Sequence, residues 1–444
     1  MIILVAGISF MFGSLPVYGD GAGGYFLYRQ IVEKNYSFSI TDPPLNYSGS
    51  YIFTRGAHGW STFYQVGAPA VWFLFSPFTA FLPTPSPARS VLLGSAPILL
   101  HDGIAILVIS SLCCIGTLLL WTRTLRHIFH FSRIHAVAAS FASFIGLPAW
   151  YYAFSVPSYA HTIELFFLTL ALSLFFRALS QPSLVMFSAI GCAVGVAALT
   201  RMDALLYLAI FTIISLTVLH RTAVVPLVIL TTSCMIILSL QFIVWHRIFG
   251  SIFPNVGYNP QGFTFPLHAA DVLFSGSRGF FIWSPIAVIG LVGLCILIFQ
   301  RHMLSYIAAL MGVQALLFYV LFYGSWEMWW GGLSFGQRFL IPLFPFVALG
   351  VAAVVRALTS SPGYMRFVGT ALVVAAVGYS FSLALLYPTA AQRNRLPLEE
   401  DSAPAETARN MIGYYFTSRD GVPAGGWRVW YNATLRPSHL LFSF

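Results

Sequence analysis

The feature that most constrains this chain is a series of apolar stretches, each long enough to cross a lipid bilayer. A transmembrane helix needs about 20 predominantly apolar residues, and eleven stretches fit that description. They are 2–18, 103–122, 134–152, 160–176, 182–200, 204–219, 223–245, 281–299, 303–323, 339–355 and 367–387. Only 8% of the residues are charged, whereas soluble domains carry roughly 25%. The sequence therefore predicts an all-α polytopic membrane protein and excludes a soluble enzyme, a disordered chain and a nucleic-acid-binding protein.

The distribution of charge gives the expected orientation of these helices. Cytoplasmic loops of membrane proteins carry an excess of arginine and lysine. With the N-terminus inside, the inner loops hold eight arginines and no carboxylate, which leaves 14 basic and 13 acidic residues for the outer side. The net charge of +9 thus divides into +8 inside and +1 outside. We expect the N-terminus inside and the C-terminus outside.

The stretch 66–83 is apolar enough to be a further span. Counting it as one would move the eight inner arginines to the outer side, so we expect it not to cross. It is predicted to be a helix that lies in, or dips into, the outer leaflet and is broken by Pro69 and Pro77. Irregular backbone at membrane depth persists only against protein or a wet cavity, so this segment is predicted to roof a cavity.

The irregular sequence is concentrated on the predicted outer side. A first outer loop covers 19–102, a second covers 246–280, and a C-terminal tail of 388–444 follows the membrane domain of 1–387. Transporters commonly show paired half-repeats with interrupted helices, and none is visible here. Long loops in compact proteins are usually functional. This favours an enzyme, while a non-enzymatic lipid or small-solute transporter, or a flippase, stays open as the alternative.

Asp20 opens the first outer loop, between Gly19 and Gly21. The residues that follow, 22–35, have the spacing of an amphipathic helix, with Tyr25 and Tyr28 on the apolar face, and we expect this helix to lie on the membrane surface. Asp20 has two interpretations. It is either the N-cap of that helix or a general base whose apolar surroundings raise its pKa toward working pH.

The first predicted helix ends just before Asp20, and an amphipathic helix and a Pro-containing apolar segment follow it. This order of elements resembles the GT-C superfamily of membrane glycosyltransferases. Five segments are also similar to motifs of its bacterial members. They are FYQVGAPAVWFLFSPF (63–78), GLPAWYYAFSVPSYAHTIELFF (146–167), ALTRMDALLYL (198–208), LFSGSRGFFIWSPI (273–286) and WWGGLSFGQRFLIPLFPF (329–346). The motifs occur in the same order as in that superfamily, and together the resemblance extends over most of residues 1–350. Gln65, Val66 and Ala160 depart from the commoner residues of these motifs.

The resemblance implies a GT-C-like bundle of about 11 helices in the cytoplasmic (inner) membrane of a bacterium. It also implies transfer of a sugar, on the outer side, from a polyprenyl-phosphate donor to a glycan, lipid or protein acceptor. Asp20 would be the base of an inverting transfer. Arginine recognises phosphate through planar bidentate contacts, and four arginines on the outer side are candidates for the donor phosphate: Arg278, Arg338, Arg201 and Arg55.

The remaining candidates are residues that could contact substrate or a metal ion. Substrate contacts are predicted for Tyr25, Tyr64, His161, Glu327 and Trp330. Glu164 lies three residues after His161 on the same helix face, and Asp203 is expected to cap the helix at 204. No cofactor is required by the spacing, although Asp20 with Asp42 or His58 could bind Mg²⁺ or Mn²⁺. Glu33 and Asp271 are expected to be exposed.

Overall fold

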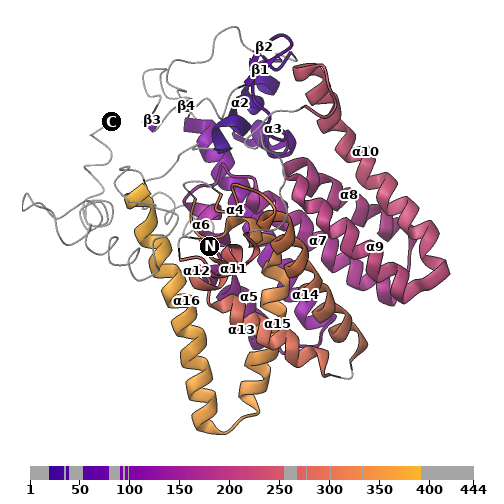
Figure 1. Cartoon of the computed structure of the whole chain (residues 1–444), viewed down its shortest axis with the longest axis vertical. Coiled ribbons are helices and arrows are strands. Elements are labelled where there is room, and N and C mark those ends of the chain that lie inside the picture. Colours follow the sequence, from indigo (N-terminus) through magenta and orange to yellow (C-terminus); the bar gives the residue numbers. More distant parts are fainter. Residues whose placement is uncertain are drawn as a thin grey trace, which may run out of the picture. The chain divides into compact units, whose positions relative to one another are not determined.

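The described part of the chain is mainly helical and includes two short β-hairpins (Figure 1). The computed structural model describes residues 20–34, 37–39, 54–79, 91–93, 96–98, 100–254, 268–276, 278–300, 302–331 and 334–391. These residues form two compact units, one within Met1–Thr117 and Tyr152–Pro260 and the other within Leu118–Tyr151 and Gln261–Ser443. The first predicted span, 2–18, and the C-terminal tail lie outside the described residues.

The first unit contains the hairpins and most helices of the N-terminal half. Its elements are α2 (Asp20–Val32), β1 (Thr54–Gly56), β2 (Gly59–Ser61), α3 (Gly67–Thr79), β3 (Val91–Leu93), β4 (Ala96–Ile98), the start of α4 (Leu100–His127), the end of α6 (Ala149–Phe154), α7 (His161–Ser180), α8 (Leu184–Thr200), η2 (Met202–Ala204), α9 (Leu205–Leu219), η3 (His220–Ala223) and α10 (Val224–Phe249). Strands β1 and β2 pair antiparallel, with Arg55 opposite Trp60, and β3 pairs antiparallel with β4.

The second unit contains the C-terminal helices together with one early helix, α5. Its elements are the end of α4, α5 (Arg133–Gly146), the start of α6, α11 (Ala269–Phe274), α12 (Phe280–Trp283), α13 (Ile286–Ile298), α14 (Met303–Gly324), η4 (Arg338–Leu343), α15 (Phe344–Thr359) and α16 (Gly363–Ala391).

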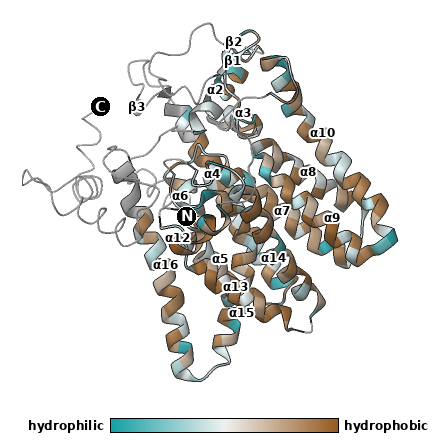
Figure 2. Ribbon diagram, viewed as in Figure 1, coloured by the Kyte–Doolittle hydropathy of each residue, from teal (hydrophilic) through white to brown (hydrophobic). Residues whose placement is uncertain are grey.

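Apolar helices dominate both units (Figure 2). Within the described residues, six helical stretches are long and apolar enough to cross a membrane, and α8 and α13 are shorter apolar helices. The predicted spans from 103 onward all coincide with helices. Two of them are divided: α5 ends before Pro148, and Pro285 precedes α13. Proline lacks the N–H that a helix interior requires, which accounts for both divisions.

Within the stretch 66–83, residues 67–79 form one helix, so the predicted breaks at Pro69 and Pro77 are wrong. Helix α3 runs from Gly67 to Thr79 and includes both prolines. Pro69 lies in the first turn, where its missing N–H costs nothing. Pro77 leaves the Phe73 carbonyl without its usual helical donor, and the Ser76 hydroxyl donates to that carbonyl instead, at 2.8 Å. At 13 residues, α3 is too short to span a bilayer.

Helix α2 forms where the sequence predicts a helix, but its tyrosine face contacts protein rather than the membrane surface. Tyr25 and Tyr28 are 4% and 2% exposed. They pack in a core shared by α2, α3, α4 and α7, where the Tyr28 ring meets the edge of Trp72. The amphipathic spacing predicted the burial of Tyr25 and Tyr28, but Leu27 and Gln30 are buried as well, and the expected contact with the membrane surface is wrong for the two tyrosines.

Glycines allow close contacts between helices in each unit. In the first unit, a Cβ on Gly195 of α8 would lie 2.9 Å from the Cys234 carbonyl oxygen of α10. In the second unit, Gly293 of α13 and Gly350 of α15 bring two backbones into direct contact, with no room for a side chain on either residue. Small residues let membrane helices approach in this way.

Candidate active site

Asp20 is the first residue of α2 and is partly exposed. The Tyr64 hydroxyl donates a hydrogen bond of 2.9 Å to Asp20 Oδ1. The N-terminus of a helix carries a partial positive charge, so the Asp20 side chain lies beside both this charge and the Tyr64 hydroxyl. Tyr64, predicted to contact substrate, thus lies against the predicted base.

The glycines that flank Asp20 are required by close contacts. A Cβ on Gly21 would overlap the Ser158 side chain, which belongs to the short connection between α6 and α7. A Cβ on Gly23 would overlap the Tyr64 ring and lie 2.8 Å from Thr62 Oγ1. The glycine-rich start of α2 therefore lets Asp20 sit directly beside Tyr64 and the α6–α7 connection.

The segment that carries Tyr64 is fixed to α10. The Val66 backbone N–H donates to Gln241 Oε1 at 2.8 Å, and the Trp245 indole N–H donates to the Phe63 carbonyl at 3.3 Å. Gln241 is fully buried. Tyr64 is therefore held between two residues that are each bonded to a long apolar helix.

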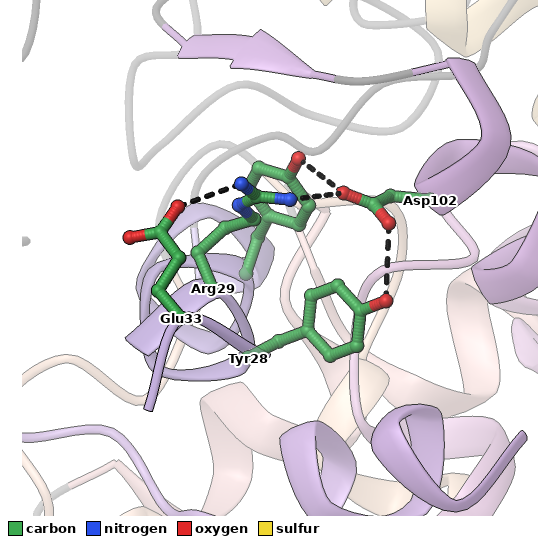
Figure 3. A network of polar contacts seen from close by, with 5 residues as sticks. Tyr28, Arg29, Glu33 and Asp102 are labelled. Atoms are coloured by element: carbon green, nitrogen blue, oxygen red, sulfur yellow. Dashed lines mark hydrogen bonds and ion pairs between the residues drawn. The ribbon is translucent and has the colours of Figure 1, made fainter. Parts of the chain in front are cut away.

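A second carboxylate, Asp102, lies near the start of α4 and receives three donors from α2 (Figure 3). Tyr25 donates to Oδ2 at 2.8 Å, Tyr28 to Oδ1 at 3.0 Å, and Arg29 Nη1 to Oδ2 at 3.3 Å, while Arg29 Nη2 also donates to Glu33 at 2.6 Å. Burial and the adjacent carboxylate raise the pKa of the Tyr28 phenol, so it stays a proton donor. We call these five residues the Asp102 cluster.

Sequence reasoning missed Asp102. The available signal was an acidic residue directly before the apolar stretch 103–122, which by itself is typical of an ordinary helix N-terminus. The partners of Asp102 lie 73 to 77 positions earlier in the chain. No local pattern links residues over that distance.

Arg201 lies between two carboxylates. Its Nε is 3.1 Å from Glu164 Oε2 and 3.1 Å from Asp203 Oδ1, and Glu164 is fully buried. His161 Nδ1 is 3.7 Å from the same Glu164 oxygen, so the predicted pairing of His161 with Glu164 on one helix face is confirmed. Asp203 lies in η2, with Ala204 as the N-cap of α9. The Arg201 charge is thus engaged by protein carboxylates.

Arg278 and Arg338 are both buried in the second unit, at 3% and 6% exposure. The Arg278 guanidinium lies 5.6 Å from the centre of the Trp283 ring. The Trp283 ring in turn contacts Phe335 edge-on, at 5.5 Å between ring centres, three residues before Arg338. One aromatic contact therefore joins the two segments that carry these arginines.

The backbone around Arg338 requires glycine. Gly331 has φ +71°, a left-handed conformation that favours glycine, and a Cβ there would lie 3.1 Å from Arg338 Nε. Gln337 is 1% exposed, and its amide donates to the Trp329 carbonyl at 3.2 Å. Gly331 thus lies beside the Arg338 side chain, with little space for a side chain of its own.

The remaining candidates lie apart from these contacts. Arg55 and His58 are exposed in or beside the β1–β2 hairpin, Glu327 is exposed after α14, and Trp330 is half-buried with its ring edge-on to Trp329. Asp42 lies outside the described residues. Among the residues that the structure describes, no group of three or more His, Cys, Asp or Glu side chains could hold a metal ion.

Sequence comparison finds no relative: no protein-family model matches the chain, and no curated protein matches it significantly. Comparison with solved structures, in contrast, finds proteins of similar fold. The oligosaccharyltransferase of Archaeoglobus fulgidus in its apo form has a TM-score of 0.50 at 12% identity, over 97% of this chain and 63% of that chain. This chain thus spans less than two thirds of the archaeal enzyme's length.

Two further structures give similar values. The same oligosaccharyltransferase in complex with Zn and sulfate has a TM-score of 0.49 at 13% identity, over 97% of this chain and 61% of that one. ArnT from Cupriavidus metallidurans bound to undecaprenyl phosphate has a TM-score of 0.48 at 16% identity, over 98% and 78%. The resemblance predicted from the order of the sequence motifs is confirmed at the level of the fold: the chain has the fold of the GT-C membrane glycosyltransferases.

Proposed function

We propose that this protein transfers a sugar from a polyprenyl-phosphate-linked donor to an acceptor hydroxyl on the outer side of a bacterial cytoplasmic membrane. The observation that carries the proposal is the setting of Asp20. In a GT-C fold, a partly exposed carboxylate opens a helix and accepts a hydrogen bond from Tyr64 at 2.9 Å. Asp20 is thus accessible from one side and fixed on the other.

The chemistry needs a base and a means of holding the leaving phosphate. The acceptor oxygen attacks the sugar C1, the C1–O bond to phosphate breaks, and the phosphate leaves with the electron pair. The acceptor proton passes to the Asp20 carboxylate. Attack from the side opposite the phosphate inverts the configuration at C1. Because the phosphate is already a good leaving group, Asp20 has only to deprotonate the acceptor.

Arg278 and Arg338 are proposed to bind the donor phosphate. Both are almost completely buried, and the contact between Trp283 and Phe335 joins the two segments that carry them. A phosphate anion suits a guanidinium with its fork of N–H donors. Arg201, a further candidate, has its Nε 3.1 Å from the carboxylate oxygens of Glu164 and Asp203.

The test is turnover by purified protein in nanodiscs, with a panel of polyprenyl-phosphate sugars, in EDTA and in Mg²⁺ or Mn²⁺. Asp20→Asn keeps the shape and the capping oxygen but cannot accept the proton, so turnover should fall by about 10²–10⁴-fold while donor binding persists. Asp271→Asn makes the same chemical change at a half-exposed carboxylate and should leave turnover unchanged.

Two outcomes contradict the proposal. Full activity of Asp20→Asn would mean that Asp20 only caps α2, because asparagine caps helices equally well. Absence of turnover by the unmodified protein with every donor would remove the transferase assignment and favour a lipid or solute carrier.

A further inference from the structure

We propose that Asp102 is a positioning residue that sets the rotation of α2 about its own axis and so holds Asp20 against Tyr64. The inference rests on the proposed role of Asp20 as a base, and it assigns a task to a carboxylate that itself makes no contact with substrate in that mechanism. Asp102 is 1% exposed.

The hydrogen bonds that Asp102 accepts come from one face of α2. Tyr25, Tyr28 and Arg29 are spaced i, i+3 and i+4, so they project from the same side of the helix. Their donors reach both carboxylate oxygens of Asp102, at 2.8, 3.0 and 3.3 Å (Figure 3). A helix held by three donors at one carboxylate cannot rotate about its axis without breaking these bonds.

Asp102 is itself held in place by the helix that carries it, α4. Asp102 is the third residue of α4, where the helix N-terminus stabilises a negative charge, and α4 continues as a membrane-spanning candidate from Ala105. Tyr28 also packs edge-on against Trp72 of α3, at 6.3 Å between ring centres. The orientation of α2 is therefore tied to a long apolar helix through a buried ionic contact.

The orientation of α2 determines where the Asp20 carboxylate lies. Asp20 begins the same 13-residue helix, and its side chain lies about 5–6 Å from the helix axis. A rotation of about 20° would therefore move the carboxylate by roughly 2 Å. That displacement breaks the hydrogen bond from Tyr64, and an error of about 1 Å in a reacting group can cost about 10²-fold in rate.

The contact requires the charge of Asp102 and not only its shape. Asparagine has one acceptor oxygen and an NH₂ group that would point a donor at a hydroxyl or at the guanidinium. Asp102→Asn should therefore break the hydrogen bonds that α2 donates to one of the two Asp102 oxygens, with no change in side-chain size. Glu33→Gln is the matched control, because it makes the same change at the exposed end of the cluster, where Glu33 is 50% exposed.

The test compares these two variants in nanodiscs. We expect Asp102→Asn to lower kcat about 10²-fold with an unchanged KM for the donor, and to speed hydrogen exchange of the α2 amides. Glu33→Gln should change neither quantity. In an Asp20→Asn background, Asp102→Asn should lower the residual rate no further, because it acts through Asp20.

The outcomes separate this inference from the proposed function. If the unmodified protein turns over no donor, the proposed function fails, and hydrogen exchange of α2 alone decides whether Asp102 anchors the helix. If the protein is active and Asp102→Asn keeps both its kcat and the protection of α2, the inference is wrong. If Asp102→Asn fails to fold, Tyr28→Phe replaces it, since it removes one donor and keeps the ring; unchanged kcat and α2 protection there would also overturn the inference.

Discussion

At the scale of single residues, the proposed base Asp20 accepts a hydrogen bond from Tyr64. The two residues are 44 positions apart and meet through one hydrogen bond. Tyr64→Phe removes the hydroxyl and keeps the ring over Gly23. A hydrogen bond to a charged group contributes about 1.5–3 kcal/mol, so kcat should fall about ten- to 100-fold. A full rate for Tyr64→Phe in the donor assay would show that Asp20 is held by other contacts.

Arg278 and Arg338 give the second prediction at this scale. If each contributes one charge-assisted phosphate contact of about 1.5–3 kcal/mol, replacement by alanine should raise the donor KM about ten-fold or more. Arg133→Ala removes an exposed arginine at the start of α5 and serves as the control. Donor titrations of the three variants check this. Unchanged donor affinity in both Arg278→Ala and Arg338→Ala would exclude them from the phosphate site.

The candidate site was predictable from sequence where its signal is local. Asp20 was marked by Gly19 and Gly21, and a side chain on Gly21 would overlap Ser158. Asp102 was not predictable, because its donors come from a distant segment. The engagement of Arg201 by Glu164, 37 positions earlier, is a similar case. Chemistry that depends on long-range contacts leaves no trace in short motifs.

At the scale of helices, hydropathy predicted where helices occur but not where they end. The divisions at Pro148 and Pro285 depend on whether nearby groups replace the missing N–H, as the Ser76 hydroxyl does beside Pro77 in α3. Proline alone therefore did not distinguish a break from a continuous helix. The spacing of residues in α2 also did not predict what covers its tyrosines, because that depends on how distant helices pack together.

The contact of α8 with α10 gives a prediction about stability. A side chain at Gly195 would meet the Cys234 carbonyl oxygen at 2.9 Å and Ile237 Cβ at 2.8 Å. Gly195→Leu must push the helices apart, and such overpacking costs roughly 1–3 kcal/mol. We expect a lower Tm in thermal unfolding. Gly378→Leu in α16, where no atom lies within 4 Å of the added Cβ, is the matched control. Equal Tm values for the two variants would contradict this packing.

At the scale of the whole molecule, the same fold occurs in proteins that share very little sequence identity with this chain. The archaeal oligosaccharyltransferase shares the fold at 12% identity. An apolar helix bundle requires hydrophobicity and approximate side-chain volume at most positions, and many sequences satisfy those requirements. This explains why the sequence predicted the fold class from its apolar spans and the order of its motifs.

The orientation in the membrane is a prediction for the molecule as a whole. The division of charge into +8 and +1 places the β1–β2 hairpin outside and the turn between α15 and α16 inside. A cysteine replacing the exposed Ala57 should react with an impermeant maleimide in intact cells, and one replacing the exposed Ser360 should react only after lysis. The reverse pattern would invert the topology.

The bonds between α10 and the segment that carries Tyr64 impose an order on biosynthesis. Phe63 and Val66 are bonded to residues synthesised 182 and 175 positions later. At about 5–20 residues per second, a ribosome needs roughly 10–35 s to make that length of chain. If this segment lies outside as predicted, it is exported well before α10, to which it is bonded, has been synthesised. Tyr64 reaches its place beside Asp20 only after α10 has entered the membrane, so a nascent chain interrupted before α10 carries an incomplete site.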